Sequence, residues 1–382
     1  MSKNKPSPRR RQHANITASD VAERAGVSPM TVSRVINGEA SVRERTKKAV
    51  NEAIRELGYS PNKAARSLAS ANQIRIGLLY SNPSSTYLSK MLLGVLEQAR
   101  QSDTQIVVVE CAAGSDTDAV IHGMVEDGVD GIILAPPLCD SKQAFRTLRA
   151  NSMPTVSIGS PHKSSEISSV CIDDYLASHT ITQHLISLGH SRIGFIIGTA
   201  EQAASTLRLA GFRAALAEAG LEIFDELIVQ GEFSYQSGFQ ATDQLLNLDS
   251  PPTAILASND DMAAGVIAMA HRHHIDVPDD LTVCGFDDTF FATTIWPNIT
   301  TIRQPITEMS SLAIEMLEKT IRGHRRHPGK AIKSKHRELD FLLMLRDSDA
   351  PPSAYANKSA PGNKKSSMAR RFGSGSSRKP PA

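Results

Sequence analysis

The sequence predicts an α/β protein in which a three-helix head precedes a body of two doubly wound parallel sheets. Residues 16–57 place apolar side chains at helical spacing, with capping residues between the segments. From Ile74 onward, short apolar runs alternate with amphipathic segments, which is typical of parallel sheets covered by helices on both faces. The alternation is too long for one small sheet, and 382 residues can bury a large core.

Two short helices joined by a tight turn are predicted within residues 16–38. Ala18-Ser19-Asp20 offers hydroxyl and carboxylate caps for the first helix, and Gly26 ends it because glycine adopts a positive φ at little cost. Ser28 caps the second helix, and Pro29 suits its first position because that position needs no N–H. A unit of this kind fits the major groove of DNA.

The second helix, which Asn37-Gly38 ends, has an apolar inner stripe and a polar outer face. The inner stripe consists of Val32, Val35 and Ile36, and a third helix over residues 44–57 supplies the rest of the core. The outward residues are Pro29, Met30, Thr31, Ser33 and Arg34. The Arg34 guanidinium suits either a guanine edge or a phosphate, and the sequence leaves both open.

Charge is distributed unevenly along the chain. Residues 1–70 hold 14 Lys and Arg against 6 Asp and Glu, whereas residues 71–347 hold 21 against 33. Residues 348–382 are basic again, with 7 against 1. A basic head on an acidic body suits a module that binds a polyanion and is carried by a body that does not. Such binding weakens as salt rises, because each neutralised phosphate releases counterions.

Cysteine spacing and the lack of targeting signals favour a reducing cytoplasm. The four cysteines are far apart in the sequence: Cys111, Cys139, Cys171 and Cys284. No two of them have the spacing of zinc ligands, and we expect no disulfide framework. The sequence has no apolar run of 18 residues, and its basic N-terminus lacks the apolar stretch of a signal peptide. Residues 1–15 and 348–382 are rich in Ser, Pro, Gly, Lys and Arg, and we expect both to be disordered.

The body alternates expected strands with expected helices. The strands are residues 74–79, 106–109, 131–134, 155–158, 170–172, 193–197, 254–256 and 281–284. The helices are residues 87–101, 116–127, 141–150, 174–188, 202–219, 235–247, 260–273 and 307–321.

Polar residues follow several expected strands, where parallel α/β sheets bind their ligands. These residues are Ser81, Asn82, Asn259, Asp260, Asp287 and Asp288, with Arg208 and Phe233 in nearby segments. Carboxylate, amide and guanidinium groups can each bind two neighbouring hydroxyls of a polyol, and an aromatic ring covers the apolar face of a sugar. Structural roles remain open for Asp287 and Asn259 as caps and for Phe233 as a core residue. Arg208 is harder to explain that way, because an unpaired charge among apolar neighbours is costly.

The motifs between Thr17 and Ser70 point to a known family. They are Asp20-Val21-Ala22, Ala25-Gly26-Val27-Ser28, Thr31-Val32-Ser33-Arg34-Val35-Ile36-Asn37-Gly38, Leu57-Gly58-Tyr59-Ser60-Pro61-Asn62 and Ala65-Arg66-Ser67-Leu68. Together they closely resemble the DNA-binding region of the lactose-repressor/galactose-repressor (LacI/GalR) family of bacterial transcription regulators. The resemblance implies that Pro29, Met30 and Arg34 set operator preference, within a DNA-binding set of Ser28, Pro29, Met30, Thr31, Ser33, Arg34, Asn37, Asn62, Arg66 and Leu68.

Residues 61–72 resemble the hinge helix and linker of that family. A helix of about two turns is too short to be stable alone in water. The resemblance implies that it folds only on DNA, beside its copy from a second subunit, with Leu68 wedged into the minor groove. The alternative is a linker that happens to contain a leucine.

For the body, the resemblance implies the fold of periplasmic sugar-binding proteins, whose two halves close on a ligand. The effector contacts that it implies are Ser81, Tyr87, Arg208, Phe233, Asn259, Asp287 and Gln304. One position departs from the family pattern, since Gly159 stands where many members carry an aspartate, and this leaves the effector's identity open. Trp296 either stacks on the ligand or anchors a loop.

We therefore expect a cytoplasmic regulator, associated with the nucleoid when bound, that represses transcription as a homodimer on a near-palindromic operator. A small molecule, expected to be a sugar or sugar derivative, controls its affinity for DNA; no cofactor, metal or membrane is expected. The alternatives are a purine-type co-repressed regulator, a sugar-acting α/β enzyme and a solute-binding protein. The expected domains are a basic arm (1–15), the helix-turn-helix (16–60), the hinge (61–72), the effector and dimerisation domain (73–347) and a basic tail (348–382).

Overall fold

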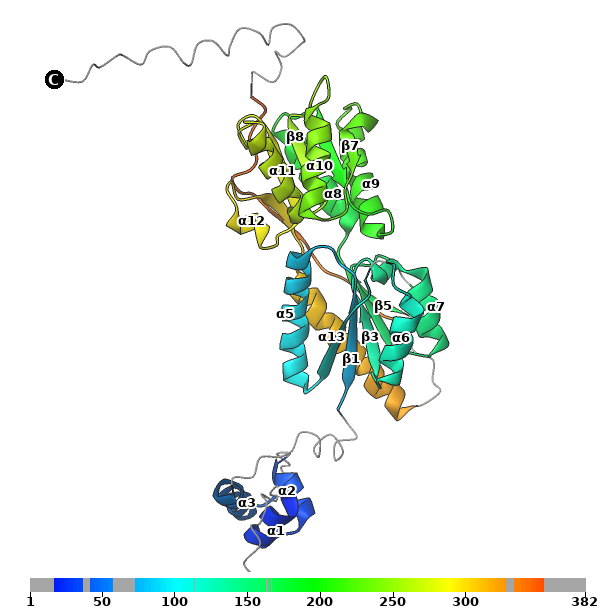
Figure 1. Ribbon diagram of the computed structural model, residues 1–382, viewed down its shortest axis with the longest axis vertical. Coiled ribbons are helices and arrows are strands. Elements are labelled where there is room, and N and C mark those ends of the chain that lie inside the picture. The colour runs from blue at the N-terminus through cyan, green and yellow to red at the C-terminus, as the bar shows by residue number, and fades with distance from the viewer. Residues whose placement is uncertain are drawn as a thin grey trace, which may run out of the picture. The chain divides into compact units, whose positions relative to one another are not determined.

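The computed structural model describes residues 17–36, 42–57, 73–112, 114–162, 164–165, 167–327 and 333–353. The chain divides into two compact units, Met1–Gln73 and Ile74–Ala382, which are called the head and the body below. Each is described by itself (Figure 1). Within the described segments, no helix combines the length and the apolar character needed to cross a membrane.

The head is a small bundle of three helices, α1 (Ala18–Ala25), α2 (Pro29–Ile36) and α3 (Glu44–Leu57). Val21, Val32 and Val50 are fully buried between them, so each helix contributes a valine to one small core. The predicted second and third helices are confirmed in position.

The turns of the head follow the expected chemistry with one correction. Helix α1 is capped by Thr17, one residue before the predicted caps, and Asp20 lies inside the helix. The Asp20 carboxylate accepts a hydrogen bond from the Thr17 amide at 2.7 Å, which forms a capping box. Gly26 ends α1 at φ +65°, and the Ser28 hydroxyl accepts from the Thr31 amide at 3.2 Å at the start of α2, as predicted.

The body contains two six-stranded sheets with the same strand order. The first sheet runs β11-β5-β4-β3-β1-β2 and the second runs β12-β10-β9-β8-β6-β7. Neighbouring strands in both sheets pair in parallel, except β10 and β12, which are antiparallel. The strands of the first sheet are β1 (Arg75–Tyr80), β2 (Gln105–Glu110), β3 (Gly131–Leu134), β4 (Thr155–Ile158), β5 (Ser168–Cys171) and β11 (His336–Glu338). Those of the second are β6 (Ile193–Ile197), β7 (Ile228–Gln230), β8 (Ala254–Ala257), β9 (Thr282–Asp287), β10 (Thr300–Arg303) and β12 (Leu342–Met344).

Helices cover both faces of each sheet, as Figure 1 shows. The first sheet is flanked by α5 (Ser85–Ser102), α6 (Thr117–Glu126), α7 (Lys142–Ala150) and α13 (Ile306–Arg326). The second is flanked by α8 (Asp174–Ser187), α9 (Ala203–Glu218), α10 (Tyr235–Leu246) and α11 (Asp260–Arg272), with the short α12 (Phe291–Thr294) nearby. Short 3₁₀ turns lie at Leu138–Asp140 and Asp225–Leu227.

The two halves of the body exchange their final helices. Helix α8 follows β5 of the first sheet but packs on α9 and β10 of the second. Helix α13 follows β10 of the second sheet but packs on α5 and on β3, β4 and β5 of the first. The chain therefore crosses between the halves at residues 172–173 and 304–305, and again at 339–341 between β11 and β12.

Most predicted elements of the body are found, with differences at the sheet edges. The strands β7, β10, β11 and β12, each of three or four residues, were not predicted. The body also extends beyond its predicted end at residue 347, because residues 348–353 pack against it. The Ser348 side chain is buried and accepts a hydrogen bond from the Thr300 amide at 2.9 Å, and the Ala350 carbonyl accepts from Thr282 at 2.9 Å.

Glycine allows α10 and α11 to approach closely, and this gives a test of the packing. A Cβ on Gly238 of α10 would collide with the backbone of Met262 in α11. We expect Gly238→Ala to lower the free energy of unfolding by about 1–3 kcal/mol, as overpacking does. Gly123→Ala in α6 is the control, because a Cβ there meets nothing within 4 Å. It should stabilise the helix by about 0.5–1 kcal/mol. Urea titration followed by circular dichroism measures both, and equal effects would contradict this packing.

Candidate functional site

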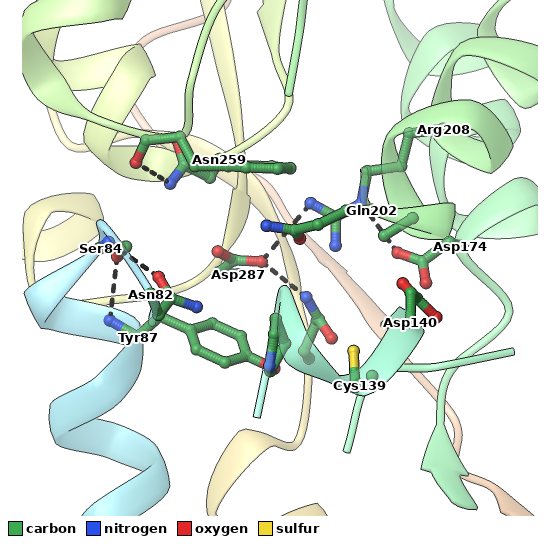
Figure 2. A pocket seen from close by; sticks show the side chains of 15 residues that line it. Asn82, Ser84, Tyr87, Cys139, Asp140, Asp174, Gln202, Arg208, Asn259 and Asp287 are labelled. Carbon is green, nitrogen blue, oxygen red and sulfur yellow. Dashed lines mark hydrogen bonds and ion pairs between the residues drawn. The ribbon is translucent and has the colours of Figure 1, made fainter. Parts of the chain in front are cut away.

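A cavity lies between the two halves of the body, where the carboxyl ends of their parallel strands face each other. Its volume is about 30 Å³. Because one water needs about 10–15 Å³ by this measure, the cavity has room for about two waters. Figure 2 shows its lining side chains, which come from both halves. They are Asn82, Ser84, Tyr87, Pro136, Cys139, Asp140, Gly159, Asp174, Gln202, Ala204, Arg208, Phe233, Asn259, Asp287 and Gln304.

Arg208 is the central cation of the site. It is 5 % exposed, and its Nε donates to the Asp174 carboxylate at 2.8 Å. One terminal nitrogen donates to the carbonyl of Ser258 and lies 3.8 Å from the Asp287 carboxylate. The guanidinium carbon lies 3.6 Å from the centre of the Phe286 ring, a cation–π contact. Two carboxylates and a carbonyl therefore satisfy this buried charge.

Asp287 lies at the end of β9 in a strained backbone conformation. Its φ is +104°, and the next residue, Asp288, has φ +52°. Such angles are unusual for residues with a side chain and persist where the surrounding structure fixes them. The Asp287 carboxylate accepts a hydrogen bond from the side-chain amide nitrogen (Nε2) of Gln304 at 2.6 Å. Gln304 lies on the second crossing between the halves. The strain therefore directs a carboxylate into the cavity beside a crossing segment.

Burial raises the pKa of Asp174 and Asp287 above the ordinary aspartate value, and Arg208 opposes this shift in both. A third carboxylate, Asp140, lines the same cavity. Three carboxylates thus line a cavity that holds one guanidinium, and two of them contact it. Among the described residues, no group of three His, Cys, Asp or Glu side chains is placed to hold a metal ion.

Asn259 and Phe233 form the wall contributed by the second sheet. The Asn259 side chain caps α11 by accepting from the Met262 amide at 2.9 Å, and it donates to the Phe233 carbonyl at 2.9 Å. Phe233 is 6 % exposed and adopts φ +58°. Asn259 is therefore a cap and a cavity residue at once, so the structural role considered for it does not exclude the functional one.

Six of the seven residues named as effector contacts line the cavity: Tyr87, Arg208, Phe233, Asn259, Asp287 and Gln304. Ser81 is not part of the lining, whereas Asn82 and Ser84 are. Trp296 also lies outside it and is 73 % exposed. Binding by the six residues stays a prediction.

Five polar residues of the lining were not predicted from the sequence: Ser84, Cys139, Asp140, Asp174 and Gln202. Asp174 could have been found, because it follows an expected strand just as Asp287 does. Cys139 and Asp140 lie in a 3₁₀ turn, for which the sequence had no signal.

The candidate DNA-binding face is on α2 of the head. Ser28, Pro29, Ser33 and Arg34 are exposed, Met30 is 66 % exposed, and Thr31 is partly exposed. The outward face that the sequence predicts is therefore present on a helix of eight residues. Asn37, Asn62, Arg66 and Leu68 lie outside the described residues.

Comparison with known proteins matches both units of the chain. Residues 17–62 match the family model of bacterial regulatory proteins of the lacI family, and residues 182–347 match that of the periplasmic binding protein-like domain. Catabolite control protein A of Priestia megaterium is 35 % identical over 307 residues, which are 80 % of this chain and 92 % of that protein. The ribose operon repressor of Escherichia coli (strain K12) is 35 % identical over 307 residues, 79 % of this chain and 92 % of that protein.

The same likeness holds in three dimensions. The structure of the lac repressor dimer bound to operator and the anti-inducer ONPF superposes with a TM-score of 0.72 at 28 % identity. The match covers 88 % of this chain and all of that one. With the helical head, the two parallel sheets and relatives of this identity and coverage, this chain belongs to the lacI family of bacterial regulatory proteins.

Proposed function

We propose that this protein represses transcription by binding a near-palindromic operator as a homodimer, and that an uncharged sugar in the cleft of the body controls its affinity for that operator. The observation that carries the proposal is the cavity between the two halves, lined by a buried Arg208, carboxylates, amides and an aromatic ring. Relatives of known role, such as the ribose operon repressor, are transcription regulators rather than enzymes. The place of action is the cytoplasm, where the operator lies.

The DNA half of the proposal is supported by the exposed face of α2. Met30 offers an apolar contact that suits a thymine methyl group, and Arg34 suits a guanine edge or a phosphate. Residues 61–72 are proposed to form a hinge helix on DNA, where Leu68 from each subunit kinks the central base step. Net positive charge in residues 1–70 supplies the salt-sensitive part of the affinity.

The ligand half of the proposal is supported by the charge balance of the cavity. Asp174 and Asp287 already balance Arg208, and Asp140 adds a further carboxylate. A phosphate or carboxylate on the ligand would meet these groups without a cation left to balance it. Hydroxyls can instead donate to the carboxylates, and the Phe233 ring offers an apolar face. An uncharged polyol therefore fits better than an anionic ligand.

The homodimer is supported by an apolar surface formed by α5 of the first half and by Phe290 of the second half. Leu93 and Leu96 of α5 are 64 % and 53 % exposed, and Phe290 is 65 % exposed. Leu93 and Phe290 line one groove beside α5. Exposed apolar surface of this kind marks interaction sites, and the similar lac repressor structure is a dimer on its operator. A second copy of this chain is the proposed occupant.

Control by the ligand is proposed to act through the relation between the two halves. A ligand shifts this relation only by as much as its affinity differs between the open and closed arrangements. Coupling to DNA must then be reciprocal, so operator binding alters ligand affinity by the same factor. Release by an inducing sugar is the expected direction, and co-repression by a purine is the alternative.

The cavity can be tested with a thermal-shift screen of uncharged sugars, their phosphate esters, uronic acids and purine bases. We expect at least one uncharged sugar to raise Tm, and its phosphate ester to give no shift. Tyr87→Phe removes one hydroxyl from the lining and should weaken that sugar's binding about tenfold. Arg208→Ala should abolish the shift. Ser81→Ala is the control, and a loss equal to that of Tyr87→Phe would contradict the assignment. Shifts by purines alone would favour the co-repressed alternative.

The hinge can be tested with Leu68→Ala. We expect operator affinity to fall about 10–100-fold, because the kink at the central base step allows contacts between protein and DNA that form only in the specific complex. Affinity for random duplex should change much less, since phosphate contacts dominate it. Fluorescence anisotropy with both duplexes at one salt concentration gives the comparison. Equal losses on the two duplexes would show that Leu68 is no wedge.

The dimer surface can be tested with Leu93→Glu. We expect the Leu93→Glu variant to be monomeric in light scattering and to lose operator affinity, because a dimer would bury the glutamate charge in its interface. Leu342→Glu changes a leucine that is 58 % exposed on β12 and should leave a dimer. A stable wild-type tetramer in the absence of DNA would contradict the homodimer. A dimer that survives Leu93→Glu would rule out this surface as the proposed interface.

A further inference from the structure

Two carboxylates reach across the cleft from opposite sides. Asp261 of α11, in the second half, accepts hydrogen bonds from the hydroxyls of Ser84 at 3.0 Å and Thr86 at 2.6 Å, in the first half. Asp140, in the first half, accepts from the backbone amide of Ala203 at 2.9 Å, in the second half. Figure 2 shows Ser84 and Asp140 on opposite sides of the cavity, with Asp287 between them.

These two contacts are equivalent by the topology of the body. In the strand orders, β1 and β3 of the first sheet correspond to β6 and β8 of the second. Asp140 lies in the connection after β3, and Asp261 lies in the first turn of the helix after β8. Ser84 and Thr86 are at the start of the helix after β1, and Ala203 begins the helix after β6. Each half thus offers the carboxylate after its third strand to the first helix of the other half.

The contact at α9 supplies a cap that this helix lacks within its own half. Helix α9 has Gln202 at its N-cap, and that side chain makes no capping hydrogen bond. The Asp140 carboxylate binds the first amide of α9 instead, where a negative charge also meets the positive end of the helix dipole. At the other contact, Asp261 is 5 % exposed. Burial raises the pKa of its carboxyl group, and the hydrogen bonds from the Thr86 and Ser84 hydroxyls oppose this shift.

Helices α5 and α9, which these contacts hold at their starts, each carry a polar residue of the cavity. Tyr87 lies in the first turn of α5, where its amide donates to the Ser84 hydroxyl at 3.1 Å. Arg208 lies further along α9, in the helix that Asp140 holds at its start. The cavity has room for about two waters, so admitting a larger molecule requires the halves to move apart. That movement must stretch or break the contacts made by both carboxylates.

We propose that Asp140 and Asp261 act as a symmetric pair of latches that hold the two halves closed and set the equilibrium between the closed and open cleft. Each latch consists of hydrogen bonds that a carboxylate largely shielded from water accepts from the other half, and breaking them leaves a buried polar group without its partner. Because the latches lie on opposite sides of the cavity, loss of either one should let the cleft open. The inference does not depend on the identity of the ligand.

The latches can be tested by measuring the distance between the halves in the full-length protein. Spin labels on Lys142→Cys and Glu201→Cys, which are exposed positions of the first and second half, report this distance by pulsed electron paramagnetic resonance. The four native cysteines are buried, so labelling is directed to the introduced thiols. Excess unlabelled chain ensures that a dimer carries one labelled copy.

We expect Thr86→Val, which keeps the shape of the side chain but removes its hydroxyl, to raise the ratio of open to closed populations about tenfold. Thr86→Ser keeps the hydroxyl and should retain the wild-type distances. Asp140→Ala should open the cleft to a similar degree. Its control is Ser160→Ala, because the Ser160 hydroxyl donates to Asp140 at 2.6 Å within the same half. That variant should leave the cleft closed.

Circular dichroism confirms that each variant is folded before its distances are compared. Unchanged distances in both Thr86→Val and Asp140→Ala would overturn the proposal. It would also fail if Thr86→Ser or Ser160→Ala opened the cleft as far as its partner variant does, because the effect would then come from local packing rather than from the bond across the cleft.

Discussion

The arrangement of the site depends on a single buried guanidinium. Arg208 has too little exposure to be solvated by water, so its charge must be met by protein groups. Those groups come from the start of α8, the loop after β8 and the end of β9. Three separate chain segments are thereby drawn to one point, and the strained backbone of Asp287 is tolerated because its carboxylate is needed there. The polar lining of the cavity is built outward from this contact.

The sequence predicted the elements whose own residues define them. The strands at residues 131–134 and 193–197 were found at their actual bounds, because continuous apolar runs of this length suit buried parallel strands. Gly26 and Ser28 at the turns of the head were predicted for the same reason, because each acts on the backbone next to it. The strand at Thr300–Arg303 was missed because half of it is threonine and its place is set by pairing with β9 and β12 on either side.

The candidate site could be predicted where its residues lie at or near the carboxyl ends of strands. Arg208, Asn259 and Asp287 were identified because ligands bind beyond the carboxyl ends of parallel strands. Of the two residues named after the first strand, Ser81 was taken as the effector contact but Asn82 lines the cavity, since the direction of a side chain in a loop changes with every residue and no local pattern fixes it. Asp140 was missed for a deeper reason, because its partner Ala203 lies 63 residues away and in the other half. Only the folded arrangement brings them together.

The exchange of α8 and α13 between the halves has a consequence for how such a body can change over evolutionary time. Each sheet is covered partly by a helix that the chain assigns to the other, so no single cut separates two complete lobes. Recombination at the crossing before α8 or before α13 would leave a lobe with an uncovered apolar face. The two lobes must therefore be inherited together, and new ligand preferences are expected to arise by substitution in the cleft rather than by swapping one lobe for another.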